Sequence, residues 1–302
     1  GLSRCAVATR DFTTLRSNEK KRKPCPQEII SYRKMEQFKD CRFTVVVPVY
    51  NEEGNMDALE KALAGYLRRM GSAACVLLVD DASTDGSLRR IISMCRRNEG
   101  FYYIALECNG GLSAALKAGI DAVRTPLVGY MDADLQTTPE DFDLLLPYAE
   151  EYALVTGVRV DRRDGWFKRL QSRIANAFRR MMTGDEATDT GCPLKVMQTA
   201  YARRVPFFKG LHRFLPAMML LQGGRVMEVP VRHFPRTAGV SKYRLRNRLV
   251  APLIDCFAYR WMRNRYIDYR IAADNLPADV VKDEARVRRT AGQSAPEAAV
   301  HA

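Results

Sequence analysis

The chain has 302 residues, of which 47% are hydrophobic, and it carries a formal net charge of +13. A chain of this length and apolar content is expected to fold into one large domain or two modest ones, which excludes general disorder. Its eight cysteines are scattered without a CxxC pair and only three histidines are present, which argues against a zinc site.

Two further properties concern the cellular setting. We interpret the cysteines as reduced thiols, which are typical of a cytoplasmic protein. No apolar run approaches the roughly 18–20 residues that a membrane span needs, and no secretory signal opens the chain. The protein is therefore expected to touch a membrane without crossing it.

The charge is unevenly distributed along the chain. Residues 41–157 hold 17 acidic and 10 basic side chains, whereas residues 158–182 hold 2 and 8, and residues 232–270 hold 2 and 10. Such asymmetry indicates an anionic partner for the basic segments, namely nucleic acid, anionic lipid or phosphate.

In chain order, residues 1–40 are polar and charged, and they are predicted to form an extension with at most a short helix at 27–39. From residue 43 onward, short apolar runs alternate with helical patterns. This alternation predicts βαβ units, and hence an α/β fold in which a mostly parallel, twisted sheet is covered by helices on both faces. The predicted strands are 43–49, 75–79, 101–106 and 127–131, and the predicted helices lie around 59–67, 88–95 and 112–123.

Polar side chains follow the ends of three predicted strands, where ligands bind in sheets of this kind. Asp132 and Asp134 follow the fourth strand. Their carboxylates suit Mg²⁺ or Mn²⁺, and Gln136 offers a third oxygen. The alternative is an acidic cap for a helix that begins at Pro139.

A second motif, residues 79–86, closes the second strand and opens a helix. Its acidic pair is suited to hydrogen bonding with a nucleobase or ribose, while Ser83 or Thr84 is expected to cap the helix. After the first strand, the Pro-Val-Tyr-Asn-Glu segment at 48–52 supplies a rigid turn, an aromatic face and an acceptor. A nucleoside would fit against this segment, although ordinary packing also accounts for the tyrosine.

Two basic amphipathic segments follow. In residues 165–182, apolar side chains recur every three or four residues from Trp166 to Met181, with arginine and lysine between them. Residues 243–266 repeat the pattern, and Pro252 predicts a kink or a break. We interpret both as helices in a membrane interface. The alternative for the first segment is core packing with a solvated face, and the alternative for the second is binding to a membrane protein.

The motifs at 45–55, 79–86, 109–115 and 131–136 together resemble those of family-2 glycosyltransferases with the GT-A fold. Within that family they look like the dolichyl-phosphate or polyprenyl-phosphate mannosyltransferases, and the resemblance covers roughly residues 42–245. It implies transfer of a hexose, by default mannose from GDP-mannose, to a polyprenyl or dolichyl phosphate. It also implies inversion at the anomeric carbon, Mg²⁺ or Mn²⁺ as cofactor, and peripheral binding at the cytoplasmic face of a membrane.

The resemblance implies roles for individual residues. The residues implied to contact the nucleoside are Pro48, Tyr50, Glu52, Val79 and Asp81. Those implied to hold the diphosphate are Asp132, Ala133 and Asp134, and those implied to bind the metal are Asp132, Asp134 and Gln136. Three basic residues match positions near donor or acceptor phosphates, namely Arg159 and the loop pair Arg236 and Lys242. Asp189 belongs to an acidic segment at the acceptor side.

The identity of the acceptor decides whether a general base is needed. A lipid phosphate is already anionic and can attack the anomeric carbon directly, whereas a glycan hydroxyl would need a base, for which Asp189 is the candidate. Thr137-Thr138 and Cys192-Pro193 depart from the family pattern, which leaves the sugar and the acceptor open. A non-enzymatic RNA-binding protein is a minor alternative, since the chain lacks the aromatic signature of such proteins.

These observations predict four parts of the chain and a set of partners. The parts are an extension at 1–40, a GT-A catalytic domain at 41–242, an amphipathic interface or partner helix at 243–272 and a disordered tail at 273–302. The expected partners are a GDP- or UDP-sugar, the lipid phosphate and an anionic membrane surface, with an integral-membrane protein as a further candidate. Nucleic acid is not expected.

Overall fold

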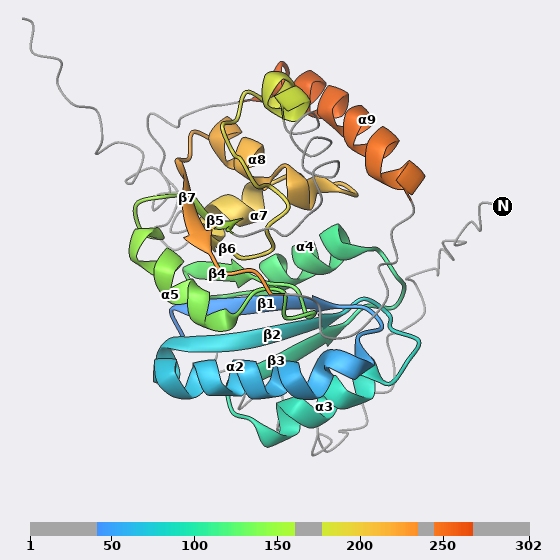
Figure 1. The fold of residues 1–302 in the computed structure, drawn as a ribbon, viewed down its shortest axis with the longest axis vertical. Coiled ribbons are helices and arrows are strands. Elements are labelled where there is room, and N and C mark those ends of the chain that lie inside the picture. Colours follow the sequence, from blue (N-terminus) through green and yellow to red (C-terminus); the bar gives the residue numbers. More distant parts are fainter. Residues whose placement is uncertain (1–40, 161–176, 235–244, 268–302) are drawn as a thin grey trace, which may run out of the picture. The chain divides into compact units, whose positions relative to one another are not determined.

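The computed structural model describes residues 41–160, 177–234 and 245–267 of the chain. Within these ranges, seven strands form one sheet with the order β3-β2-β1-β4-β6-β5-β7, flanked by helices (Figure 1). The predicted α/β fold with a mostly parallel sheet is thereby confirmed. The predicted extension at 1–40 and tail at 273–302 lie outside the described residues.

The first four strands are parallel and reproduce the predicted alternation. β1 pairs with β2 and β4, and β2 pairs with β3. Because each connection crosses back over the sheet, the carboxyl ends of all four strands point to the same edge. The strands are β1 (Phe43–Val49), β2 (Ala74–Asp80), β3 (Phe101–Ala105) and β4 (Leu127–Tyr130), and the helices between them are α2 (Met56–Met70), α3 (Ser87–Arg97) and α4 (Leu112–Ala122).

The second half of the sheet mixes directions. β6 (Lys195–Gln198) is antiparallel to both β4 and β5 (Leu154–Arg159), and β7 (Val226–Val231) is parallel to β5. The sequence predictions contain neither β6 nor β7. The remaining elements are η1 (Glu53–Asn55), η2 (Gly71–Ala73), η3 (Pro139–Asp141), α5 (Phe142–Leu145), η4 (Leu146–Tyr148), α7 (Thr199–Arg204), η5 (Leu211–Arg213), α8 (Leu215–Leu221) and α9 (Leu245–Arg263).

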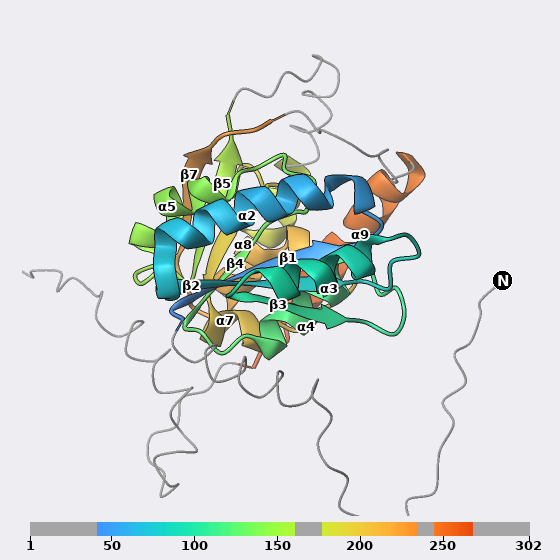
Figure 2. The same ribbon diagram turned by 90° about the horizontal axis from the view of Figure 1, so that it is seen from below.

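Helices cover both faces of the sheet, with α2 on one side and α4 and α7 on the other (Figure 2). Val45 and Val47 of β1 point into the core that includes α2 and α3, while Val46 points into the core that includes α4. A strand buried on both faces favours apolar side chains, and β1 is apolar except for Thr44, whose buried hydroxyl hydrogen bonds with Thr125 Oγ1 at 2.8 Å. α4 lies so close that a Cβ atom at Gly119 would approach Val46 to 2.5 Å.

Helix α9 packs on the core that includes α4, through the buried side chains of Cys256 and Tyr259. The Tyr259 hydroxyl donates to the carbonyl oxygen of Ala217 in α8 at 3.1 Å. The helix continues through position 252, so of the two outcomes predicted at Pro252, a kink or a break, the break does not occur. A proline removes one backbone hydrogen bond, and the packing of the following turns on the core offsets that loss.

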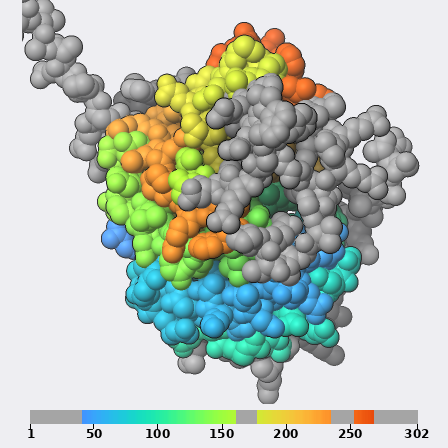
Figure 3. Space-filling view, viewed as in Figure 1, coloured from blue at the N-terminus to red at the C-terminus, as the bar shows by residue number. Residues whose placement is uncertain are grey.

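Residues 177–183 are helical and lie beside α9, as Figure 3 shows and as the edge-to-face contact of Phe178 with Phe257 at 6.5 Å indicates. They end the predicted amphipathic segment, whose earlier residues, Trp166 among them, lie outside the described residues. Arg179 is one of the basic residues between the apolar positions of that segment, yet it is only 7% exposed and pairs with Asp185, so it does not belong to a solvated basic face. Helical periodicity does not register Asp185, which lies beyond the helix and neutralises the buried charge.

Candidate active site

The carboxyl edge formed by β1, β2 and β4 holds three residues in an unusual backbone conformation. Asn51, Ala82 and Leu135 have φ angles of 52°, 56° and 54°, and they are the positive-φ residues other than glycine in the described part of the chain. Each follows the end of one of the three strands. This conformation costs on the order of 1 kcal/mol or more for such residues, and it clusters at functional sites. The turns at this edge are therefore held by the surrounding contacts.

Hydrogen bonds join the turns after β1 and β2. The backbone N–H of Asn51 donates to Ser83 Oγ at 3.0 Å, and the N–H of Thr84 donates to Asn51 Oδ1 at 2.7 Å. The N–H of Glu52 likewise donates to Ser87 Oγ at 2.9 Å. Ser83 and Thr84 therefore fasten two loops together, and the expectation that one of them caps α3 is wrong, because the cap position is Gly86.

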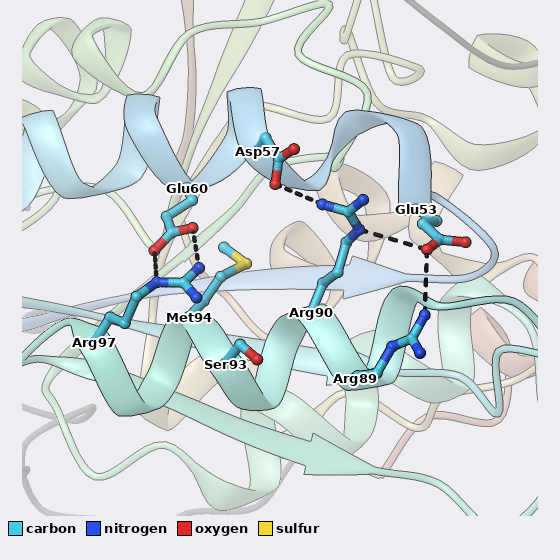
Figure 4. Close-up of a pocket in the computed structure, with 8 residues that line it drawn as sticks. All are labelled: Glu53, Asp57, Glu60, Arg89, Arg90, Ser93, Met94 and Arg97. Carbon is cyan, nitrogen blue, oxygen red and sulfur yellow. Dashed lines mark hydrogen bonds and ion pairs between the residues drawn. The ribbon is translucent and has the colours of Figure 1, made fainter.

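A charged groove of about 310 Å³ runs between α2 and α3, beside these turns (Figure 4). Its carboxylates pair with arginines across the groove: Asp57 with Arg90 at 2.7 Å and Glu60 with Arg97 at 2.6 Å. Glu53 approaches Arg90 at 3.5 Å and also accepts the backbone N–H of Gly86 at 3.0 Å. Because its opposite charges neutralise one another, we interpret the groove as structural: its ion pairs hold α2 and α3 together.

The buried carboxylate of Asp81 organises the loop after β3. It accepts the backbone N–H groups of Gly110 and Gly111, both at 2.8 Å, and the Asn109 side-chain amide at 3.0 Å. Gly111 has φ 82° and ψ 169°, a conformation open essentially to glycine alone. The Asn-Gly-Gly motif is thus explained by its attachment to Asp81. Since a carboxylate can accept about four hydrogen bonds, Asp81 retains capacity for a nucleoside.

The other predicted nucleoside residues lie near this edge to different degrees. Tyr50 is 37% exposed just beyond β1, and Glu52 accepts the side-chain amide of Asn55 at 2.7 Å. Pro48 is buried within β1, directly opposite Val79 of β2. Val79 has no exposed surface and packs in the core with α4, so it supports this edge from behind.

Asp132 and Asp134 lie immediately beyond β4. The Tyr130 hydroxyl donates to Asp132 Oδ1 at 2.8 Å, and Asp134 Oδ1 accepts the backbone N–H of Gln136 at 3.1 Å. Ala133, between the two carboxylates, is buried in the core. Burial, reinforced by the charge of Asp134, raises the pKa of Asp132 to about 6, although the Tyr130 hydroxyl lowers it.

This pair fits a hard divalent cation. Burial first, and then repulsion by Asp134, raises the pKa of Asp132, and a bound Mg²⁺ or Mn²⁺ would offset both by pairing with the carboxylates. The backbone carbonyl of Gln136 accepts the N–H of Phe234 at 2.9 Å, which fixes the turn. In the described ranges no group of three His, Cys, Asp or Glu side chains is placed to hold a metal ion by itself. The remaining ligands would therefore be oxygens of a diphosphate, water or the Gln136 amide. The alternative of a helix cap is wrong, since Thr138 precedes η3.

Arg159 and Asp189 form an ion pair at the end of β5. Two guanidinium nitrogens of Arg159 donate to the two carboxylate oxygens of Asp189, each at 2.8 Å, and the backbone N–H of Arg159 donates at 3.2 Å. The positive charge of Arg159 also acts on Asp132. Proton transfer to Asp189 would disrupt this ion pair, which weakens the case for Asp189 as a general base. Arg236 and Lys242 lie outside the described residues.

Sequence reasoning missed two groups near this site. Lys195 is fully buried at the start of β6 and acts electrostatically on Asp132. His212 lies 3.0 Å from Ser113 Oγ through its Nδ1 atom. Burial first, and then the charges of Arg213 and Lys195, lower the pKa of His212 to about 3. A lysine inside an apolar run was the available signal for the first group, whereas nothing local distinguishes the histidine.

Comparisons with known proteins agree with this geometry. The family model "Glycosyl transferase family 2" matches residues 44–208. The undecaprenyl-phosphate 4-deoxy-4-formamido-L-arabinose transferase of Edwardsiella ictaluri is 33% identical over 228 residues, which are 74% of this chain and 70% of that protein. The dodecaprenyl-phosphate galacturonate synthase of Rhizobium johnstonii is 34% identical over 208 residues, which are 66% of this chain and 61% of that protein.

Solved structures show the same fold at low sequence identity. The glucosyl-3-phosphoglycerate synthase of Mycobacterium tuberculosis, crystallised with Mn²⁺, UDP-glucose and phosphoglyceric acid, superposes with a TM-score of 0.54 at 17% identity, covering 78% of this chain and 84% of that one. The mannosyl-3-phosphoglycerate synthase of Rubrobacter xylanophilus gives 0.55 at 16% identity, covering 82% of each chain. The fold is that of GT-A glycosyltransferases. Given the family match over more than half of its length, this chain belongs to glycosyl transferase family 2.

Proposed function

We propose that this enzyme transfers a hexose, with inversion, from a nucleotide-sugar to a polyprenyl or dolichyl phosphate at the cytoplasmic face of a membrane. The observation that carries the proposal is the crowded Asp132–Asp134 pair at the carboxyl edge of the sheet, in a chain whose two relatives are named for polyprenyl-phosphate sugar transfer. Membership in a glycosyltransferase family leaves no support for a non-enzymatic RNA-binding protein.

The donor is assigned to the three turns at this edge. Tyr50, Glu52 and the remaining acceptor capacity of Asp81 would hold the base and ribose, with Pro48 and Val79 packed side by side in the strands behind them. The turns after β1 and β2 are already joined to each other through Asn51, so little ordering of these two turns remains to be done when a nucleotide binds.

The diphosphate is assigned to the turn at 132–134. Asp132 and Asp134, with Gln136 as a further candidate, would hold Mg²⁺ or Mn²⁺ there. The cation would act as a Lewis acid that neutralises charge developing on the departing diphosphate. The protein's own share is to fix both carboxylates: Tyr130 orients Asp132, and the backbone of Gln136 orients Asp134.

The acceptor is proposed to be a phosphate because the site offers cations rather than a base. Arg159 lies close enough to act on Asp132, and Arg236 and Lys242 are proposed to join it. His212 is a weak base, given its pKa of about 3, and Asp189 is engaged by Arg159. A glycan hydroxyl acceptor, which needs a base, is therefore the second choice.

The outer face of α9 is suited to bind a membrane surface. The outer face of α9, comprising Leu253, Ile254, Phe257 and Trp261, has exposed fractions of 44%, 61%, 61% and 64%. Exposed arginines border it, and Arg265 stacks over the Trp261 ring at 5.5 Å. Apolar side chains ringed by arginine suit an interface with anionic lipid. None of the helices in the described ranges is long and apolar enough to span a bilayer.

The sugar and the base remain to be identified by experiment. The two relatives are named for different sugars, and neither is mannose, so the default of mannose from GDP-mannose has no support from them. We would offer radiolabelled GDP-mannose, UDP-glucose and UDP-N-acetylglucosamine, together with UDP-galacturonate, to the enzyme with Mn²⁺ and polyprenyl phosphate. Label should enter the organic phase from one donor and should be lost with EDTA. Transfer to a soluble glycan instead would contradict the proposal.

The same assay addresses a membrane partner. An integral-membrane protein covering the outer face of α9 would make transfer dependent on added membranes. Activity in detergent with purified enzyme and lipid phosphate would show that the enzyme suffices, whereas activity restored only by a membrane fraction would favour the partner.

A further inference from the structure

Lys195 is a buried cation to which the proposed mechanism gives no role. It begins β6, in the middle of the second half of the sheet, and its side chain has no exposed surface. An unpaired charge in such a position would be strongly destabilising, so a lysine there must be matched by its surroundings. The contacts of Lys195 show which groups compensate for the burial of its ammonium.

The first contact is with the turn that carries Asp189. The Lys195 ammonium donates to the carbonyl oxygen of Cys192 and, at 3.4 Å, to that of Thr190. The same turn is closed by the N–H of Cys192, which donates to the carbonyl oxygen of Asp189 at 3.2 Å. Lys195 therefore stabilises the turn whose first residue, Asp189, forms the ion pair with Arg159.

The second contact is electrostatic and concerns the proposed metal site. Lys195 lies directly opposite Tyr130 in the pairing of β6 with β4. Side chains of directly opposed residues emerge on the same face of a sheet, and the Tyr130 hydroxyl binds Asp132. The charges of Lys195 and Arg159 both favour the ionised form of Asp132.

The local charge balance follows from these positions. Burial lowers the pKa of the Lys195 ammonium, whereas the charges of Asp189 and Asp132 raise it and favour the protonated form. With Lys195 protonated, the three carboxylates Asp132, Asp134 and Asp189 lie among two cations, Lys195 and Arg159. The group therefore carries one net negative charge, which a divalent cation would turn into one positive charge. A metal held there would feel the repulsion of the two fixed cations as well as the attraction of its ligands.

We propose that Lys195 is a positioning residue that holds the 189–192 turn against Arg159. Its positive charge also lowers the affinity of Asp132 and Asp134 for the divalent cation. Weaker binding would allow metal and nucleoside diphosphate to leave after transfer. The inference rests on the proposed metal role of Asp132 and Asp134. It does not depend on the identity of the acceptor.

The test compares two substitutions by Mn²⁺ titration at pH 8 without donor or acceptor, using the full chain. Lys195→Gln removes the charge and keeps a hydrogen-bond donor, whereas Lys195→Met removes both. Each should bind Mn²⁺ more tightly, by about tenfold, because a nearby fixed positive charge is gone. Lys195→Arg keeps the charge and should stay within about twofold of the parent.

Arg225→Gln is the matched control. Arg225 precedes β7 at the opposite end of the sheet and pairs with exposed Glu151 at 2.8 Å, so removing its charge should leave Mn²⁺ binding unchanged. A purely structural role of Lys195 predicts the opposite sign: a loosened site binds Mn²⁺ more weakly. Unchanged or weaker binding by folded Lys195→Gln would overturn the charge role.

The positioning role has its own readout. Amide hydrogen exchange at Cys192 should accelerate in Lys195→Met and much less in Lys195→Gln, which still donates to the turn. Equal exchange in both would contradict it. If Lys195→Met fails to fold, Lys195→Gln against Lys195→Arg still decides the charge role. Because no sugar donor or lipid is present, failure here is separable from failure of the lipid-phosphate proposal.

Discussion

Replacing Asp132 by asparagine should stabilise the metal-free protein at neutral pH and not at acidic pH. The folded structure raises the pKa of Asp132 from 3.8 to about 6, chiefly through burial. A carboxyl group whose pKa is raised by folding opposes folding once it ionises. This destabilisation is absent below the unfolded pKa and complete above the folded pKa.

The magnitude follows from the size of the shift. Raising the pKa of Asp132 from 3.8 to about 6 lowers the free energy of unfolding by about 3 kcal/mol once the group is fully ionised. Asparagine carries no charge and accepts from Tyr130 through its amide oxygen, so it escapes the penalty. Allowing for local relaxation, we expect its stability advantage over the parent to grow by about 2 kcal/mol between pH 4 and pH 7.5.

Urea unfolding in EDTA at several pH values would measure this advantage. Asp143→Asn is a suitable control, because Asp143 is a half-exposed partner of Arg69 on the surface. Added Mn²⁺ should stabilise the parent and not the Asp132 variant. An advantage that does not change with pH, or that shrinks as pH rises, would refute the assignment of Asp132 as a crowded, partly buried carboxylate.

Three further predictions follow from other parts of the structure. Gly111→Ala should destabilise the protein by about 1–3 kcal/mol in urea unfolding, because its backbone conformation strongly disfavours a side chain; a neutral effect would contradict the role given to the 109–111 loop. Phe257→Glu with Trp261→Glu should abolish co-sedimentation with anionic vesicles and spare the fold, since both side chains are exposed; unchanged sedimentation would count against the α9 interface. His212→Gln should leave the pH profile of transfer unchanged between pH 5 and 8, because a pKa near 3 keeps the imidazole neutral there; loss of a titration step would show that this histidine acts as an acid or base.

The first half of the sheet, β1 to β4 with helices α2 to α4, could be predicted because the sequence pattern of each element agrees with its place in the fold. Strands buried on both faces are largely apolar runs, as in β1, and amphipathic periodicity marks α2 to α4 between them. The polar residues after each strand fell at one edge because parallel strands share a direction. The position of Asp132 and Asp134 therefore followed from topology.

The second half was less predictable because its elements depend on distant partners. β6 has four residues and starts with a buried lysine, which a pattern of apolar alternation excludes. Arg179 looked like a surface charge until Asp185 was placed against it. Ser83 and Thr84 had the local chemistry of helix caps, yet the neighbouring loop at Asn51 recruits both. In each case tertiary contacts outweigh the local signal.

The most direct test of the central claim is mass spectrometry of the lipid product. With polyprenyl phosphate, Mn²⁺ and the donor identified by the label assay, the parent enzyme should form a lipid heavier by one sugar residue that retains its phosphate. Asp134→Ala should fold and form none, and EDTA should stop the parent. Retained turnover by Asp134→Ala, or sugar attached to a hydroxyl with the lipid phosphate untouched, would contradict the account.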